Sequence, residues 1–114
     1  MTFKGSCHCG KMSYEVDAEM QPATACNCSI CSRRGYLLWF LPAEKLKLQA
    51  PLEGMSSYTF NSHKIRHYFC AICGTGTFGM AMHEGKPMAA VNVRCLEGVD
   101  LLKVEVKHFD GRKL

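Results

Sequence analysis

The sequence has few of the features that mark membrane, secreted or disordered proteins. Its longest apolar run, residues 36–41, is far too short to span a bilayer. The first ten residues, MTFKGSCHCG, contain no apolar stretch before a small-residue cleavage site, so we expect no secretory signal. Hydrophobic residues at 47% and charged residues at 21% are typical of a globular protein. We therefore expect one intracellular domain over residues 1–114, located in the cytoplasm and without a membrane partner.

Basic clusters are missing as well. The formal net charge is +4, and no run of five or more Lys or Arg residues occurs. Proteins that bind nucleic acids usually show a basic stripe or cluster, often with interleaved aromatic residues. The sequence therefore predicts no nucleic-acid partner. A small anionic ligand beside Arg33 and Arg34 is the alternative that the positive charge leaves open.

Helical periodicity is weak along the whole chain. Residues 11–16 and 103–109 alternate polar and apolar side chains, which is typical of half-buried strands. The apolar run at residues 36–41 is bounded by Gly35 and Pro42 and predicts a buried strand. The pattern predicts a mainly-β protein. We expect further strands at residues 56–60, 65–69, 75–79 and 88–93, and single helical turns at residues 30–34 and 43–46.

Cysteine is the residue that the chain has in excess, with eight in 114 residues. An intracellular protein keeps its thiols reduced, so this number favours metal ligands over disulfides. Seven of the cysteines fall into three short groups. These groups are Cys7-His8-Cys9-Gly10, Cys26-Asn27-Cys28-Ser29-Ile30-Cys31 and Cys70-Ala71-Ile72-Cys73-Gly74.

The last group gives the strongest single signal. In C-x-x-C-G, two thiolates point at one metal from a tight turn, and Gly74 supplies the backbone angles that such a turn needs. Two groups of this kind form a tetrahedral four-cysteine site. Cys28 and Cys31 are one candidate second pair, although the intervening residues 32–69 exceed the usual gap of about 15–20 residues.

Cys7 and Cys9, which are also followed by a glycine, are the other candidate pair, and spacing does not decide between the two. If they complete the site, Cys26, Cys28 and Cys31 remain as a separate set of three. Zinc takes four ligands, so a set of three either receives a fourth ligand from elsewhere or keeps one position open for chemistry.

Two other sequence features favour ordinary structural roles. Residues 74–79 match G-x-G-x-x-G, but no helical pattern follows them, as a dinucleotide-binding site would require. We therefore expect no nicotinamide site. Cys95 follows a predicted strand and is interpreted as an ordinary buried cysteine.

Five motifs together resemble the glutathione-dependent formaldehyde-activating enzyme family. That family shares its fold with small zinc-stabilised β-proteins that include the Rab exchange chaperone Mss-four. The resemblance covers nearly the whole chain, and the order of the three cysteine groups is its most specific part. The motifs are GSCHCG at residues 5–10, C-x-C-x-x-C at 26–31, FCAICGT at 69–75, N-x-R-x-L-x-G-V-D at 92–100 and HFDG at 108–111.

The resemblance implies small β-sheets clamped by a structural zinc site and a second, more labile zinc site with a catalytic role. It assigns the structural zinc to Cys7, Cys9, Cys70 and Cys73. It assigns the labile, catalytic zinc to Cys26, Cys28 and Cys31. It also implies a carbon–sulfur lyase that acts on an adduct of formaldehyde with glutathione as co-substrate.

The donor chemistry of the set of three agrees with that expectation. Three thiolates on Zn²⁺ leave a net charge of −1, which makes the ion poor at ionising water and better suited to a soft ligand such as a thiolate. A metal-bound thiol is deprotonated and becomes a nucleophile toward an aldehyde. Two interpretations of Arg33 and Arg34 are open: they offset the negative charge or bind a substrate carboxylate, or they are an exposed pair on a loop without such a role.

Two alternative functions remain open from the sequence. In the first, the same β domain is a zinc-stabilised protein-binding module without catalysis. In the second, the set of three cysteines has a thiol-redox or metal-buffering role, since an exposed group of thiols oxidises readily. The fourth ligand position of that set separates these hypotheses, because an enzyme needs it open and a structural site needs it filled.

Overall fold

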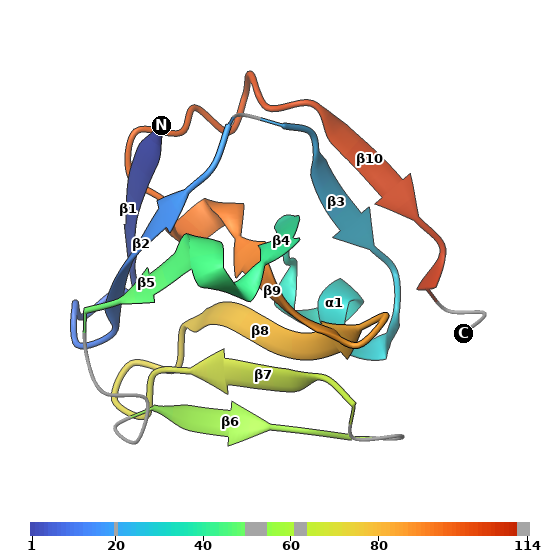
Figure 1. Cartoon of the computed structure of the whole chain (residues 1–114), viewed down its shortest axis with the longest axis horizontal. Helices are drawn as coiled ribbons and strands as arrows, with labels where there is room; N and C mark the ends of the chain where they lie inside the picture. The colour runs from blue at the N-terminus through green and yellow to red at the C-terminus, as the bar shows by residue number, and fades with distance from the viewer. Residues whose placement is uncertain (20, 50–54, 61–63, 112–114) are drawn as a thin grey trace.

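A computed structural model describes residues 1–19, 21–49, 55–60 and 64–111, and these form two β-sheets (Figure 1). The smaller sheet has the strand order β1-β2-β5 and consists of β1 (Thr2–Ser6), β2 (Ser13–Asp17) and β5 (Leu46–Leu48). The larger sheet has the order β10-β3-β4-β9-β8-β7-β6. Its strands are β3 (Ala23–Cys26), β4 (Leu38–Pro42), β6 (Ser56–Tyr58), β7 (Arg66–Phe69), β8 (Gly76–His83), β9 (Lys86–Asn92) and β10 (Val106–Phe109).

Helical structure is limited to short pieces among the described residues. Helix α1 covers Ser29–Arg34, and 3₁₀ turns cover Ala43–Lys45 and Val93–Cys95. The mainly-β class and both expected helical turns are therefore confirmed. The sheets that the family resemblance implies are present, one with three strands and one with seven. None of the helices in the described ranges combines the length and apolar character that a membrane crossing requires.

Two aromatic pairs pack the smaller sheet onto the larger one. Phe3 on β1 meets Trp39 on β4 edge to face, with ring centroids 5.4 Å apart. Tyr14 on β2 meets Phe78 on β8 in the same way at 5.5 Å. The indole N–H of the fully buried Trp39 donates to the Gln21 carbonyl oxygen over 2.9 Å. Burial of such side chains, at about 1.5–3 kcal/mol each, holds the two sheets together.

Strand β10 occupies a place that the sequence did not predict. It lies at the edge of the larger sheet, parallel to β3, with Phe109 in register with Cys26 (Figure 1). The backbone N–H of Asn27 donates to the Phe109 carbonyl oxygen, and the Asn27 side chain donates to Asp110. Residues 106–111 are thereby held against the end of β3, where the middle cysteine group begins.

Helix α1 is short because both of its ends are fixed by the local sequence. Cys28 precedes it with extended backbone angles, φ −64° and ψ 170°. Gly35 ends it in the left-handed conformation with φ 69°, and its N–H donates to the Cys31 carbonyl oxygen. This single long turn buries Cys31 and leaves Arg33 and Arg34 exposed at its end.

Candidate functional site

The first and third cysteine groups come together between the two sheets. We call this set the four-cysteine group. Its first pair lies in the turn between β1 and β2, and its second pair lies in the turn between β7 and β8. The sulfur atoms all lie within 4.8 Å of one another. Its members are Cys7, Cys9, Cys70 and Cys73.

The sulfur spacing of the four-cysteine group fits a tetrahedral zinc ion. Zinc–sulfur bonds of about 2.3 Å in a tetrahedron put neighbouring sulfurs about 3.8 Å apart. The Sγ of Cys9 lies 3.6 Å from the Sγ atoms of both Cys7 and Cys70. Four soft donors at this spacing suit zinc and leave no room for a substrate in its coordination shell.

Hydrogen-bond donors around the second pair of the four-cysteine group, Cys70 and Cys73, favour the thiolate form, whereas burial and the neighbouring thiols raise the pKa of Cys9 to about 11. The hydroxyl of Thr75 lies 3.3 Å from the Sγ of Cys73 and, with the Thr75 backbone N–H, lowers the pKa of Cys73 to about 5. The backbone N–H groups of Cys73 and Ile72 lower the pKa of Cys70 in the same way. Thiolates are the form in which cysteine binds metal, so the turn is prepared for a cation.

The middle cysteines form a second cluster, which we call the three-cysteine group. It consists of Cys26, Cys28 and Cys31, whose sulfur atoms lie within 4.8 Å of one another. Cys26 is the last residue of β3, Cys28 precedes α1, and Cys31 lies one turn further on the same helix. Among the described residues, no fourth Cys, His, Asp or Glu completes this set.

The three-cysteine group also fits a soft cation. Cys31 is buried, whereas Cys26 and Cys28 are partly exposed. The backbone N–H of Cys28 donates to the Sγ of Cys26 over 3.4 Å. Burial and the neighbouring Cys28 thiol raise the pKa of Cys31, so this thiol keeps its proton until a cation replaces it. Metal binding at this group should therefore release protons.

The C-terminal segment lies close to the three-cysteine group because Gly111 has no side chain. A Cβ atom on Gly111 would lie 2.5 Å from the Sγ of Cys26 and 3.3 Å from the Cβ of Cys28. Only a residue without a side chain leaves these two cysteines where they are. The segment that follows β10 is thus a wall of the site.

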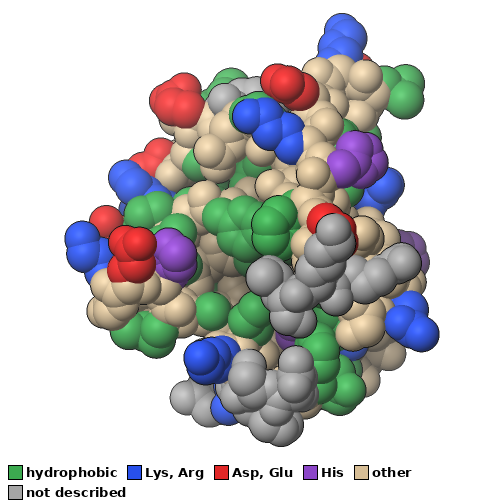
Figure 2. All heavy atoms as spheres, turned by 90° about the vertical axis from the view of Figure 1, so that its right-hand side faces the viewer, with side chains coloured by type: hydrophobic (Ala, Val, Ile, Leu, Met, Phe, Trp, Pro, Cys, Tyr) green, Lys and Arg blue, Asp and Glu red, His purple; other side chains and the backbone are tan. Residues whose placement is uncertain are grey.

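A cavity of about 520 Å³ opens beside the three-cysteine group, and we call it the apolar chamber. All three cysteines of the group line it, whereas no member of the four-cysteine group lines this cavity or the adjoining hollow that contains the two arginines. Apolar side chains dominate the rest of its wall, and Figure 2 shows hydrophobic side chains gathered around a hollow on this face. The apolar lining includes Ile30, Leu38, Phe40, Phe60, Ile65 and Phe109.

A column of stacked rings forms one side of the apolar chamber. The imidazole of His67 lies between Tyr36, at 6.2 Å with an interplanar angle of 5°, and Phe60, at 5.9 Å and 24°. Tyr58 continues the stack beyond Phe60 at 5.8 Å. Burial and the charge of Arg34 lower the pKa of His67, so the ring is neutral at pH 7. The column therefore presents flat and uncharged surfaces.

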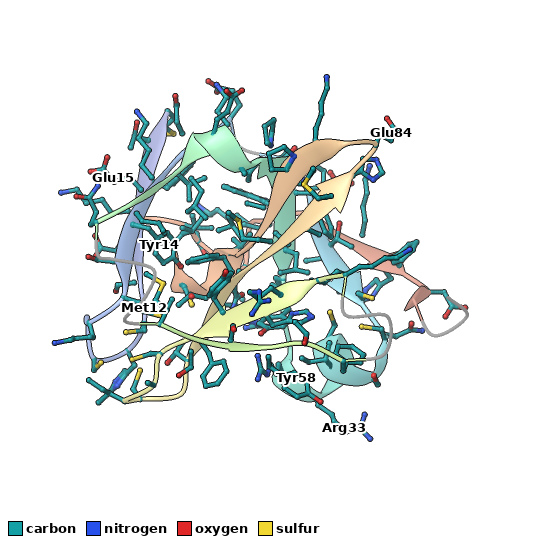
Figure 3. All side chains as sticks on the ribbon, turned by 60° about the horizontal axis from the view of Figure 1, so that its bottom comes forward. Met12, Tyr14, Glu15, Arg33, Tyr58 and Glu84 are labelled. Atoms are coloured by element: carbon teal, nitrogen blue, oxygen red, sulfur yellow. The ribbon has the colours of Figure 1, made fainter. Side chains whose placement is uncertain are left out.

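The two arginines lie in an adjoining hollow of about 400 Å³, which we call the basic hollow. Arg34 donates to the Tyr36 hydroxyl over 2.7 Å and lies over the ring of Phe69 at 5.4 Å. Arg33 donates to the Ser29 carbonyl oxygen and extends outward from α1 (Figure 3). Within the described ranges, neither arginine forms an ion pair with a carboxylate. Both guanidinium groups are thus available to an anion.

The basic hollow and the apolar chamber share part of their walls. Ser29, Ile30 and Phe60 line both of them. The arginines line the basic hollow alone and the cysteines line the apolar chamber alone, so the structure does not bring Arg33 and Arg34 into the same hollow as the three-cysteine group. The two hollows are therefore neighbours, with these three residues between them.

Two residues that could be taken for metal ligands, His8 and Cys95, lie outside both cysteine groups. His8 is exposed in the turn between Cys7 and Cys9 and belongs to neither set. The Sγ of Cys95 donates to the Gly76 carbonyl oxygen over 3.7 Å, and burial raises the pKa of this thiol. The G-x-G-x-x-G match at residues 74–79 leads into strand β8 rather than a helix, as expected.

Sequence reasoning missed several residues of this site. Gly111, Lys64 and His67 gave no signal of their own, although Gly111 ends the HFDG motif. Phe40 belonged to a strand interpreted as buried, yet its side chain is exposed at the apolar chamber. No pattern within one segment could have identified these residues, because the wall is assembled from several strands of the larger sheet.

Comparisons with known proteins agree with the cysteine pattern. A family model described as glutathione-dependent formaldehyde-activating enzyme matches residues 2–111. The chain is also similar to a protein of Rhodobacter sphaeroides with a solved crystal structure, at 31% sequence identity and a TM-score of 0.78. That match covers 91% of this chain and 99% of the other.

Proposed function

The chain belongs to the glutathione-dependent formaldehyde-activating enzyme family, and from this premise we propose that it is a zinc-dependent enzyme of the carbon–sulfur lyase type. Its substrate is a small thiol–aldehyde adduct of the S-hydroxymethylglutathione kind, which it forms or breaks down. Glutathione is the proposed co-substrate. A reducing compartment keeps the cysteines available, so we place the protein in the cytoplasm.

One observation supports catalysis over a purely structural role. The two cysteine groups differ in their surroundings, because the three-cysteine group lines the apolar chamber, whereas the four-cysteine group lines neither this chamber nor the basic hollow. A structural metal is enclosed by four protein ligands, whereas a catalytic metal keeps a position for substrate. We therefore assign the structural zinc to the four-cysteine group and the catalytic, more labile zinc to the three-cysteine group.

The chain's residues have separate roles in this proposal. Cys26, Cys28 and Cys31 would hold zinc and thereby fix where the substrate sulfur binds. When bound, the zinc ion supplies a soft Lewis acid with an open position that keeps a substrate thiol deprotonated. Arg33 and Arg34 bind the carboxylates of the thiol, and the apolar chamber keeps water away from the aldehyde carbon.

The reaction needs no oxidant or reductant. In the forward direction a sulfur lone pair forms a bond to the carbonyl carbon, and the π electrons of the carbonyl bond move to its oxygen. The proton that the thiol has lost ends on this oxygen, which gives a hydroxyl group. In the reverse direction the carbon–sulfur bond breaks, and the thiol regains the proton. Holding both partners in one cavity supplies the favourable orientation.

Two serine variants test this assignment. Cys28→Ser should abolish acceleration of adduct formation from glutathione and formaldehyde, because it removes one ligand of the proposed catalytic site. Cys95→Ser removes a thiol that belongs to neither cysteine group and should retain the rate of the unmodified protein. Rates are followed by trapping free aldehyde at set times.

A second measurement follows the metal directly. With cobalt in place of zinc, added glutathione should change the absorbance of the unmodified protein and of Cys95→Ser, but not of Cys28→Ser. If glutathione changes neither the spectrum nor the rate in the unmodified protein, the enzyme hypothesis is wrong. The zinc-stabilised binding module would then be the better description.

A further inference from the structure

The apolar chamber is larger and more hydrophobic than a formaldehyde-processing site requires. A one-carbon aldehyde occupies little more space than one or two water molecules, at about 30 Å³ each. The chamber has a volume of about 520 Å³. The sulfur end of the thiol also enters the chamber, because the three cysteines line it. An apolar group on the aldehyde would fill the remaining space and exclude water from it, which formaldehyde is too small to do.

Three of the exposed large apolar side chains lie at this chamber. Phe40 is 52% exposed, Ile65 is 48% exposed and Phe109 is 49% exposed, and all three line the chamber. They come from β4, from the residue before β7, and from β10, so three separate segments contribute to one apolar rim. Large apolar side chains that stay exposed around one concavity typically mark a ligand site.

The position of the charges indicates which half of the substrate enters the chamber. Arg33 and Arg34 line the neighbouring basic hollow, where the proposed function places the carboxylates of the thiol half. Of the Lys and Arg residues that the structure describes, only Lys64 lines the apolar chamber. With the substrate sulfur at the three-cysteine group and the thiol's charged end in the basic hollow, the chamber is left for the substituent on the aldehyde carbon.

The shape of the wall narrows the choice of that substituent. The ring planes of Tyr36, His67 and Phe60 are nearly parallel and stacked, and all three residues line the chamber. Flat ring edges and faces, together with Ile65 and Phe109, pack well against an aromatic ring or a branched alkyl chain. They offer few groups that hydrogen-bond a polar substituent.

We propose that the aldehyde half of the substrate carries a large apolar group, an aromatic ring or a branched alkyl chain, in place of a hydrogen of formaldehyde. This inference rests on the proposed thiol–aldehyde function and specifies its substrate class. The bond changes are the same: the sulfur bonds to the aldehyde carbon, and the carbonyl oxygen takes the proton. A single methylene in an apolar pocket changes kcat/KM by about 10-fold or more. A phenyl-bearing aldehyde should therefore exceed formaldehyde by at least about tenfold.

The experiment compares 3-phenylpropanal with formaldehyde, each with glutathione and the zinc-loaded protein. Each kcat/KM is divided by the uncatalysed rate constant for the same aldehyde, which removes differences in intrinsic reactivity. Binding is measured separately by calorimetry with two stable thioethers, S-benzylglutathione and S-methylglutathione. The benzyl compound should bind at least about tenfold more tightly, because the two differ only in the group that enters the chamber.

Polar substitutions at the rim test the location. Phe40→Asn and Ile65→Asn should each reduce the preference for 3-phenylpropanal and for the benzyl thioether several-fold. Leu102→Asn is the matched control, since Leu102 is 96% exposed and lines neither hollow. It should leave both preferences unchanged. Two rim residues are replaced separately, so that the test remains valid if one of the two variants does not fold.

The outcomes separate the two hypotheses. If formaldehyde is processed as well as 3-phenylpropanal, and the two thioethers bind equally, the substrate-class inference is overturned while the lyase function stands. If no aldehyde reacts faster with the protein than without it, the proposed function fails, and this inference fails with it. An equal loss of preference in Leu102→Asn would also overturn the assignment to the apolar chamber.

Discussion

Replacement of Gly111 by alanine tests whether the C-terminal segment shapes the three-cysteine group. The added Cβ would lie 2.5 Å from the Sγ of Cys26 and 3.3 Å from the Cβ of Cys28, well inside ordinary contact distance. The backbone of Gly111 is not left-handed, so the methyl group itself is the perturbation. Either the Cys26 sulfur rotates away or residues 109–111 move outward.

Both responses disturb the three-cysteine group and leave the four-cysteine group intact. Overpacking by one methyl group in a tight site costs about 1–3 kcal/mol. If this energy is taken from metal binding, zinc affinity at the three-cysteine group falls by about 5- to 150-fold. The four-cysteine group lies at other turns, between β1 and β2 and between β7 and β8, and its affinity should not change.

The assay is a competition with a chromophoric zinc chelator, which resolves a weak and a tight equivalent of zinc in one titration. Gly79→Ala is the matched control because Gly79 lines the same chamber. A Cβ on Gly79 would meet the Arg66 carbonyl oxygen at 3.5 Å and the Ile65 side chain at 3.7 Å, which are ordinary contacts. Unchanged zinc binding in Gly111→Ala would refute the proposed wall, and equal loss at both sites would indicate general unfolding instead.

Three further predictions concern the metals and the arginines. A mild chelator should remove one zinc equivalent before the other, and Cys28→Ser should lack the labile equivalent, as measured by zinc release. Cys70→Ser should lower the melting temperature sharply or prevent folding, while Cys28→Ser changes it little, because zinc binding at the four-cysteine group contributes to folding. Unaltered melting of Cys70→Ser would contradict the structural assignment. The double variant Arg33→Gln/Arg34→Gln should weaken glutathione binding several-fold in calorimetry without altering the melting temperature. Lys45 lines neither hollow, so Lys45→Gln should leave glutathione binding unchanged.

Local patterns in the sequence were sufficient for the elements whose signal lies within a few residues. The alternation at residues 11–16 and 103–109 corresponds to β2 and β10, and the turn at residues 30–34 corresponds to α1. By contrast, β1, β3 and β5 were not predicted. The β3 sequence, Ala-Thr-Ala-Cys, has little apolar contrast, and β5 has only three residues. These strands exist because neighbouring strands pair with them.

Two predicted strands have other bounds in the structure than the sequence indicated. The strand expected at residues 56–60 is β6, which covers Ser56–Tyr58, and residues 61–63 lie outside the described part. The strand expected at residues 75–79 continues to His83 as β8. Pairing with β9 along its whole length extends it, which is information from the partner strand.

The sequence by itself determined that three cysteine groups exist, because ligand spacing within a turn is a local property. Only the tertiary structure decided which groups meet. Spacing left Cys7 and Cys9 as one of two choices, and the packing of the smaller sheet on the larger one brings them to Cys70 and Cys73. The parallel pairing of β10 with β3 likewise brings Gly111 to Cys26. Contacts between residues this far apart in the chain depend on how strands pair and sheets pack, and no short stretch of sequence encodes either.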